Sequence, residues 1–167
     1  MDVKTGFVRA ISNLTRDKAG NYSEKLNYAI NATEVPGSTF KLASLMAALE
    51  DHKVKITDSV RAVGRYKFPG KTFEDANEGR GYGTISVKQA FEKSSNVFSQ
   101  IIFNAYKSEP DAFLSRLDRF GVTKPLGIDL SGEGIPKFNR PGDKKGWSGL
   151  SLPSMGIGYE MRMSAIS

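Results

Sequence analysis

Residues 34–50 read EVPGSTFKLASLMAALE and place an almost wholly apolar run directly after a Pro-Gly pair. Apolar side chains on nearly every face are typical of a buried helix, so we expect a helix from Ser38 to Glu50. Ser38 and Lys41 are three residues apart within it, and they therefore lie on one face. Lys41 is the anomaly of this helix, because a buried, unpaired ammonium is costly and tends to lose its proton.

The Ser38–Lys41 pair has the chemistry of an acyl-transfer site. A neutral amine is a general base, and it can take the proton from Ser38 while the hydroxyl attacks a carbonyl. The N–H of Ser38 and the positive end of the helix would then stabilise the developing oxyanion. The structural alternative is that Ser38 caps the helix while the stem of Lys41 packs along it and the ammonium reaches water. Because Ser-x-x-Lys is a common sequence, the motif alone favours this alternative.

A second polar group, Ser94-Ser95-Asn96, falls between two expected helices. A serine and an amide at such a corner can project into a cleft, where the hydroxyl relays a proton and the amide binds a carbonyl. Ser and Asn also favour helix caps and turns for local reasons. Taken alone, a cap or turn explains this group better.

The rest of the chain predicts an α+β fold without internal repeats. Residues 3–11 flank a Lys-Thr-Gly turn with short apolar runs, which indicates a β-hairpin. Residues 64–84 contain five glycines and few aliphatic residues, so we interpret them as a long surface connection. Helices are expected at 86–93 from a capping-box pattern, at 97–105, and at 110–120 between a proline and a glycine. Residues 122–167 predict only short pieces.

The order of these motifs is similar to that in penicillin-binding proteins and class A β-lactamases, where S-x-x-K precedes an S-D-N-type element and a K-T-G triad. Longer stretches resemble the class B, monofunctional penicillin-binding proteins in particular and cover nearly the whole chain. They are MDVKTGFVRAIS (1–12), EVPGSTFKLASLMAALE (34–50), GTISVKQAFEKSSNVFSQI (83–101), FGVTKPLGIDLSGE (120–133) and PSMGIGYEMRMS (153–164). The resemblance implies part of the α+β serine acyltransferase fold that these proteins share with β-lactamases. A β-lactamase is disfavoured, because the chain has no convincing Glu-x-x-x-Asn site for a deacylating glutamate.

By this resemblance Ser38 is the acylated nucleophile, Lys41 is its base, and Ser94 carries the proton toward the leaving group. Asn96 binds the amide of the substrate. The implied activity is that of a peptidoglycan D,D-transpeptidase, which joins the D-alanyl-D-alanine end of one stem peptide to an amine of another. The implied ligands are therefore peptidoglycan stem peptides and β-lactam antibiotics, with divisome or elongasome proteins as candidate partners. The implied location is the periplasmic or extracytoplasmic face of the bacterial cell envelope, with an inner-membrane anchor outside this chain.

The third motif of the family is the point at which the sequence departs from the pattern. Lys4-Thr5-Gly6 spells the triad but precedes Ser38, whereas the family places its triad after the second motif, on a strand that lines the cleft. No Lys-Thr-Gly or Lys-Ser-Gly follows Asn96 in the 167 residues. We therefore expect residues 1–167 to be the N-terminal portion of a transpeptidase domain, with later strands of the sheet missing and no appreciable activity of its own.

Composition limits the alternatives. The chain has no cysteine and one histidine, so we expect neither a metal site nor a cofactor. The net charge of +6 suits an anionic partner, but the lysines and arginines are scattered, so we expect no nucleic-acid partner. No apolar run approaches the ~20 residues of a membrane span, so we expect no membrane contact within this chain.

Two rival hypotheses remain. One is a non-catalytic domain that binds peptides or partner proteins, in which the serine motifs survive only as caps. The weaker one, motivated by the charge, is a binder of anionic polymers, and it requires an affinity that falls with salt.

Overall fold

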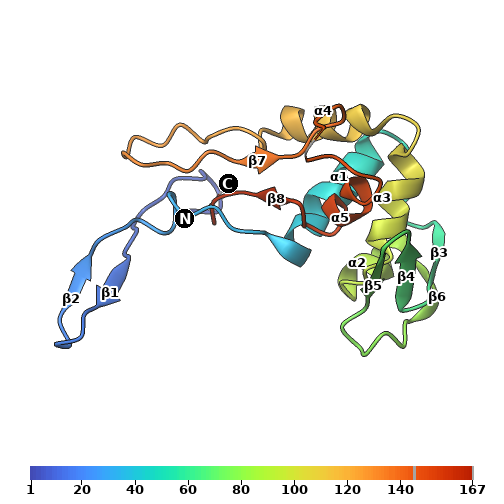
Figure 1. The fold of residues 1–167 in the computed structure, drawn as a ribbon, viewed down its shortest axis with the longest axis horizontal. Coiled ribbons are helices and arrows are strands. Elements are labelled where there is room, and N and C mark those ends of the chain that lie inside the picture. Colours follow the sequence, from blue (N-terminus) through green and yellow to red (C-terminus); the bar gives the residue numbers. More distant parts are fainter. Residues whose placement is uncertain (145, 167) are drawn as a thin grey trace.

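The computed structural model describes residues 1–144 and 146–166. Its helices gather in one body, and a thin β-hairpin near the N-terminus projects away from that body (Figure 1). The described strands pair as four separate two-stranded sheets. The α+β class expected from the sequence is therefore confirmed.

The helical body is built around α1 (Lys41–Glu50), which follows a 3₁₀ turn at Gly37–Phe40. α1 packs against α3 (Phe98–Tyr106) and α4 (Pro110–Phe120), and α3 packs against the short α5 (Ser151–Met155). The buried side chains of this core are Phe40, Ala47, Ala48, Ile102, Tyr106, Phe113, Leu114, Leu117, Leu152, Met155, Met161 and Met163. The helix expected at residues 38–50 is thus confirmed, with its first turn in the tighter 3₁₀ form.

Local capping signals set the ends of α2 and α4, as the sequence predicts. α2 (Val87–Glu92) begins after Ser86, whose hydroxyl accepts the N–H of Gln89 at 3.1 Å, while the Gln89 side chain accepts the N–H of Ser86 at 2.9 Å. α4 begins at Pro110 and ends before Gly121, which has the left-handed backbone conformation of a C-terminal cap, with φ of 81°.

Residues 64–84, expected to be a surface connection, instead supply three strands. β4 (Arg65–Phe68) pairs with β5 (Lys71–Glu74), and β6 (Gly83–Ser86) pairs with β3 (Ser59–Ala62). The expectation was wrong because it relied on the glycines and overlooked the alternation of buried and exposed residues that is typical of a strand. Tyr66 and Phe73 are buried, and the residues directly before them are exposed. Both aromatic rings belong to a second apolar core shared with α2 and α3, so the β4–β5 hairpin is fixed against these helices.

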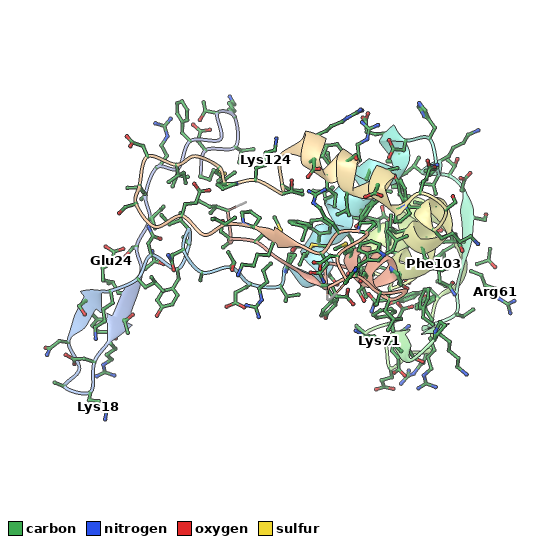
Figure 2. All side chains as sticks on the ribbon, turned by 45° about the horizontal axis from the view of Figure 1, so that its top comes forward. Lys18, Glu24, Arg61, Lys71, Phe103 and Lys124 are labelled. Atoms are coloured by element: carbon green, nitrogen blue, oxygen red, sulfur yellow. The ribbon has the colours of Figure 1, made fainter. Side chains whose placement is uncertain are left out.

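The N-terminal hairpin also lies elsewhere than expected. Its strands are β1 (Leu14–Arg16) and β2 (Tyr22–Glu24), and described residues 3–11 form no strand. Asp17 explains the position of the turn, because its carboxylate accepts the backbone N–H of Asn21 at 2.8 Å. Lys18 and Glu24 lie on this hairpin, well apart from the crowded side chains of the helical body (Figure 2).

The C-terminal part of the chain returns to the segment that precedes the 3₁₀ turn. β7 (Lys137–Phe138) pairs with β8 (Met161–Arg162), and Met163 exchanges two backbone hydrogen bonds with Glu34 at 2.9 and 3.0 Å. This pairing fixes the chain a few residues before Ser38. Within the described residues, no helix has the length and apolar character needed to cross a membrane.

One face of α1 is not covered by the described residues. Leu42 and Met46 are 53 % and 43 % exposed, and they border an apolar cavity of about 700 Å³ that Tyr28, Phe120 and Met163 also line. An apolar surface of this kind is typical of a region that another apolar element covers.

The carboxylate of Asp51 ties the three long helices together. It follows α1 directly and accepts hydrogen bonds from the Tyr106 hydroxyl of α3 at 2.7 Å and from Nε of Arg116 in α4 at 2.8 Å. Burial by itself raises the pKa of Asp51, but the hydrogen bonds from Arg116 and Tyr106 outweigh it and hold the pKa below its usual value.

We predict that Asp51→Ala lowers the free energy of unfolding by about 2–3 kcal/mol, because the buried Tyr106 hydroxyl and the half-buried Arg116 lose their acceptor. Urea denaturation at neutral pH measures this loss. As a control, Glu92→Ala breaks only the exposed pair with Lys88 and should cost less than about 0.5 kcal/mol.

The same bonds give the stability a pH dependence. Since the folded-state pKa of Asp51 is lowered, its contribution is present at neutral pH and is lost as the pH falls through that lowered value. If Asp51→Ala and Glu92→Ala lower the free energy of unfolding by equal amounts at neutral pH, the role of Asp51 in joining the three helices is contradicted.

Candidate active site

Ser38 lies exposed in the 3₁₀ turn that leads into α1. The turn is held by Gly37, which has φ of 58° and donates its N–H to the carbonyl of Gly158 at 2.9 Å. A Cβ on Gly158 would lie 1.9 Å from the Gly37 carbonyl oxygen, so only glycine fits there. No side chain caps the 3₁₀ turn or α1, and the alternative of Ser38 as a helix cap therefore does not hold.

Lys41 is 1 % exposed, and its amine points to the corner between α2 and α3. Nζ donates to the hydroxyl of Ser38 at 3.2 Å, to the carbonyl of Ser94 at 2.6 Å and to the hydroxyl of Ser94 at 3.3 Å. Burial lowers the pKa of Lys41 to about 8, and the negative charge of Asp75 acts in the opposite direction. A large fraction of the amine is therefore neutral in mildly alkaline solution, as a general base requires.

The second motif forms the corner itself. Ser94 has φ of 50°, a left-handed conformation that is uncommon for a residue other than glycine. The half-buried Asn96 donates from Nδ2 to the carbonyl of Glu74 at 2.7 Å and is thereby attached to the end of β5. The structure thus brings both Ser38 and Ser94 into contact with the amine of Lys41, and it places Asn96 two residues further along the same corner.

Two groups behind this corner were missed by sequence reasoning. Asp75 is 2 % exposed, and it accepts hydrogen bonds from the Tyr66 hydroxyl at 2.9 Å and from the Ser95 hydroxyl at 3.0 Å. The signal that could have revealed them is the alternation of buried and exposed residues in β4 and β5, which leads from Tyr66 to Asp75. Because residues 64–84 were expected to form a surface connection, neither Tyr66 nor Asp75 was assigned a role.

Lys4-Thr5-Gly6 lies in a turn near the N-terminus, where the N–H of Gly6 donates to the carbonyl of Asp2 and the N–H of Lys4 donates to the carboxylate of Asp2. These bonds stay within the turn and give the triad no link to the Ser38 corner. Within residues 1–144 and 146–166, no cluster of three or more His, Cys, Asp or Glu side chains could hold a metal ion.

Comparisons with known proteins agree with this geometry. The whole chain, residues 1–167, matches the family model described as the penicillin binding protein transpeptidase domain. Penicillin-binding protein PbpB of Mycolicibacterium smegmatis is 29 % identical over 177 residues, which cover 99 % of this chain and 26 % of PbpB. Peptidoglycan D,D-transpeptidase PbpA of Mycobacterium tuberculosis is 34 % identical over 104 residues, which cover 59 % of this chain and 20 % of PbpA.

Among solved structures, the ceftriaxone acyl-enzyme complex of penicillin-binding protein A from M. tuberculosis has a TM-score of 0.70 at 26 % identity, covering 84 % of this chain and 31 % of that one. The chain spans about a quarter of the length of PbpB. Because the family model matches from the first residue to the last and the relatives agree with it, the chain belongs to the penicillin-binding protein transpeptidase domain family and is related to its class B members.

Proposed function

We propose that Ser38 is the nucleophile of a peptidoglycan D,D-transpeptidase, with Lys41 as its base and Ser94 as the carrier of the proton. Asn96 then binds the amide of the substrate. The observation that carries the proposal is the buried amine of Lys41, which lies within 3.3 Å of the hydroxyls of both serines. A lysine so placed contributes little to stability, but it is positioned to move a proton between two hydroxyls.

In the proposed reaction the neutral amine of Lys41 takes the proton of Ser38 as Oγ forms a bond to the carbonyl carbon of the penultimate D-alanine. The Ser38 N–H stabilises the resulting oxyanion. The proton then passes through the Ser94 hydroxyl to the nitrogen of the terminal D-alanine, the C–N bond breaks, and free D-alanine leaves an ester on Ser38. An amine of a second stem peptide attacks this ester, and Ser38 recovers its proton.

We further propose that residues 1–167 are the N-terminal portion of the transpeptidase domain and that catalysis belongs to the complete protein. Two observations support this: the relatives are longer than the chain, and no Lys-Thr-Gly follows Asn96 here. The substrates are stem peptides at the extracytoplasmic face of the cell envelope. β-Lactams acylate the same serine as substrate mimics, a reaction supported by the acyl-enzyme complex of the M. tuberculosis relative.

We predict that β-lactams label the complete protein at Ser38 and at no other residue. A fluorescent penicillin should leave a label that survives denaturation, and peptide mapping should locate it on Ser38. Ser38→Ala should abolish the label, whereas Ser23→Ala, in the exposed β1–β2 hairpin, should retain it. An adduct on Ser94 or Ser95 would refute the assignment, and a complete absence of label would favour the non-catalytic, peptide-binding alternative.

A second prediction concerns the pH dependence of acylation. Because the pKa of Lys41 is lowered to about 8, the acylation rate should rise as the pH increases through this value and level off above it, where the amine is neutral. Lys41→Ala should lower the rate by about 100- to 10,000-fold. Lys41→Arg should not restore it, because a guanidinium remains protonated.

Stopped-flow or quenched acylation measured over pH 6–10 tests this prediction. The exposed Lys88 provides the matched control, since Lys88→Ala should leave both the rate and its pH dependence unchanged. Rapid acylation by Lys41→Arg would mean that positive charge, and not proton transfer, is what the position supplies.

A third prediction compares the 167-residue chain with a version extended through the downstream Lys-Thr-Gly or Lys-Ser-Gly strand. By the resemblance to the family, the downstream strand supplies a second N–H that stabilises the oxyanion beside that of Ser38. The short chain should therefore acylate far more slowly, because the loss of one such donor typically costs ~100- to 1,000-fold. Its exposed apolar face on α1 should also favour self-association. Intact-mass analysis after β-lactam exposure and thermal melts at equal concentration measure both effects. Equal acylation rates would show that the downstream motif is dispensable.

A further inference from the structure

Asp75 is a buried carboxylate that takes no direct part in the proposed reaction. It follows β5 and is 2 % exposed, and none of the ion pairs among the described residues involves it. Its oxygens accept hydrogen bonds from the hydroxyl of Tyr66, from the hydroxyl of Ser95 and from the backbone N–H of Asn96. These three donors are uncharged, and inside a protein a charge acts over longer distances than in water.

The donors of Asp75 belong to the corner that carries Ser94. The left-handed conformation of Ser94 has an energetic cost, so it persists only where the surrounding structure holds it. The hydrogen bonds of the next two residues provide this support. Ser95 binds Asp75 through its hydroxyl, and Asn96 binds Asp75 through its N–H and the carbonyl of Glu74 through its side chain. The Ser95 hydroxyl also accepts the N–H of Val97 at 3.1 Å, at the start of α3.

Asp75 is itself held by a close approach of two glycines. Its N–H donates to the carbonyl of Gly64 at 2.8 Å, and the N–H of Tyr82 donates to the carbonyl of Ala62 at 2.7 Å. A Cβ on Gly64 would lie 2.3 Å from the nitrogen of Gly81, so the loop after Asp75 closes tightly against the link between β3 and β4. Figure 1 shows these strands beside α2, at the end of the helical body that carries the corner.

We propose that Asp75 is a positioning residue, which holds the Ser94–Asn96 corner against Lys41 and supplies the negative charge that acts on the Lys41 amine. The inference rests on the proposed function of Ser38 and deepens it. Asp75 is linked to the Lys41 amine through Ser94. The carbonyl and the hydroxyl of Ser94 accept hydrogen bonds from this amine, and Asp75 binds the two residues that follow Ser94.

The charge of Asp75 also acts on the proposed base. Burial is the larger effect and lowers the pKa of Lys41, whereas the charge of Asp75 raises it, so we expect removal of the charge to lower this pKa further. Tyr66 remains protonated beside Asp75, because burial raises its pKa to about 12. The charged side chains next to this corner have partners of their own: Lys93 lies over the ring of Tyr82, and Glu74 pairs with Arg65. Further away, Lys88 and Glu92 of α2 form an exposed pair, and Arg116 of α4 is bound to Asp51 at the end of α1.

The test compares Asp75→Asn with Ser95→Ala and Tyr66→Phe in the complete protein. Asp75→Asn removes the charge and keeps the shape, whereas the other two variants each remove one donor and keep the charge. Two quantities are measured from pH 6 to 10: the rate of acylation by a fluorescent penicillin, and the NMR chemical shift of the Lys41 side chain. Asp111→Asn, an exposed carboxylate on α4, is the control and should change neither.

Asp75→Asn should slow acylation by about 10- to 100-fold, because the corner is displaced, and both pH midpoints should move to lower pH. Ser95→Ala and Tyr66→Phe should slow acylation by several-fold with unchanged midpoints. A purely structural role would lower thermal stability without moving a midpoint, so wild-type midpoints and rates in folded Asp75→Asn would overturn the inference.

The outcomes remain decisive in two further cases. If Asp75→Asn does not fold, slower acylation by Ser95→Ala and Tyr66→Phe at a temperature at which both variants are fully folded supports the positioning role, and wild-type rates in both overturn it. If the wild-type protein is not acylated at all, the proposed function fails, and the NMR titration of Lys41 alone decides the inference. A midpoint lowered by Asp75→Asn then supports it, and an unmoved midpoint overturns it.

Discussion

The burial of α1, and with it of Lys41, is the constraint on which the rest of the structure depends. α1 can sit at the centre of the helical body only if it is apolar on most of its surface, and this placement removes Lys41 from water. An amine removed from water favours its neutral form, and the pKa of Lys41 falls to about 8 for this reason. The same burial that organises the core therefore lowers the proton affinity of the proposed base, and Ser38, the proposed nucleophile, lies one turn away at the exposed entrance to the helix.

Three segments that are distant in the sequence meet around this amine. The Gly37–Phe40 turn is held by Gly158, the corner at Ser94 is held by Asp75, and Asp75 is held by Gly64. Each contact is a hydrogen bond, either between backbone groups or between buried side chains, and such bonds allow the joined segments little displacement. The geometry of the site is thus determined by loops, while the helices supply the rigid body against which those loops are fixed.

Much of this arrangement could be predicted from the sequence, because many of its signals are local. The capping box at Ser86, the Pro110 start and the Gly121 end of α4, and the spacing of Ser38 and Lys41 all act within one or two helical turns. The β4–β5 hairpin was missed because its glycines outweighed a short alternation. The same alternation could have placed Asp75 in the interior but could not have identified its partners, because strand pairing and the packing of α2 bring these partners to it.

Packing alone does not explain a lysine at position 41. A methionine fills a similar volume without an ammonium to desolvate, and replacing buried charged groups by apolar ones is often neutral or stabilising. The partners of Lys41 lessen the cost of burial but do not remove it, because they are a carbonyl and two hydroxyls and the negative charge of Asp75 acts without contact. The different exposure of the Ser38 and Lys41 side chains suits a role in proton transfer. Ser38 is open to solvent while Lys41 is 1 % exposed, so a carbonyl compound can approach the oxygen from outside while the proton leaves toward the interior.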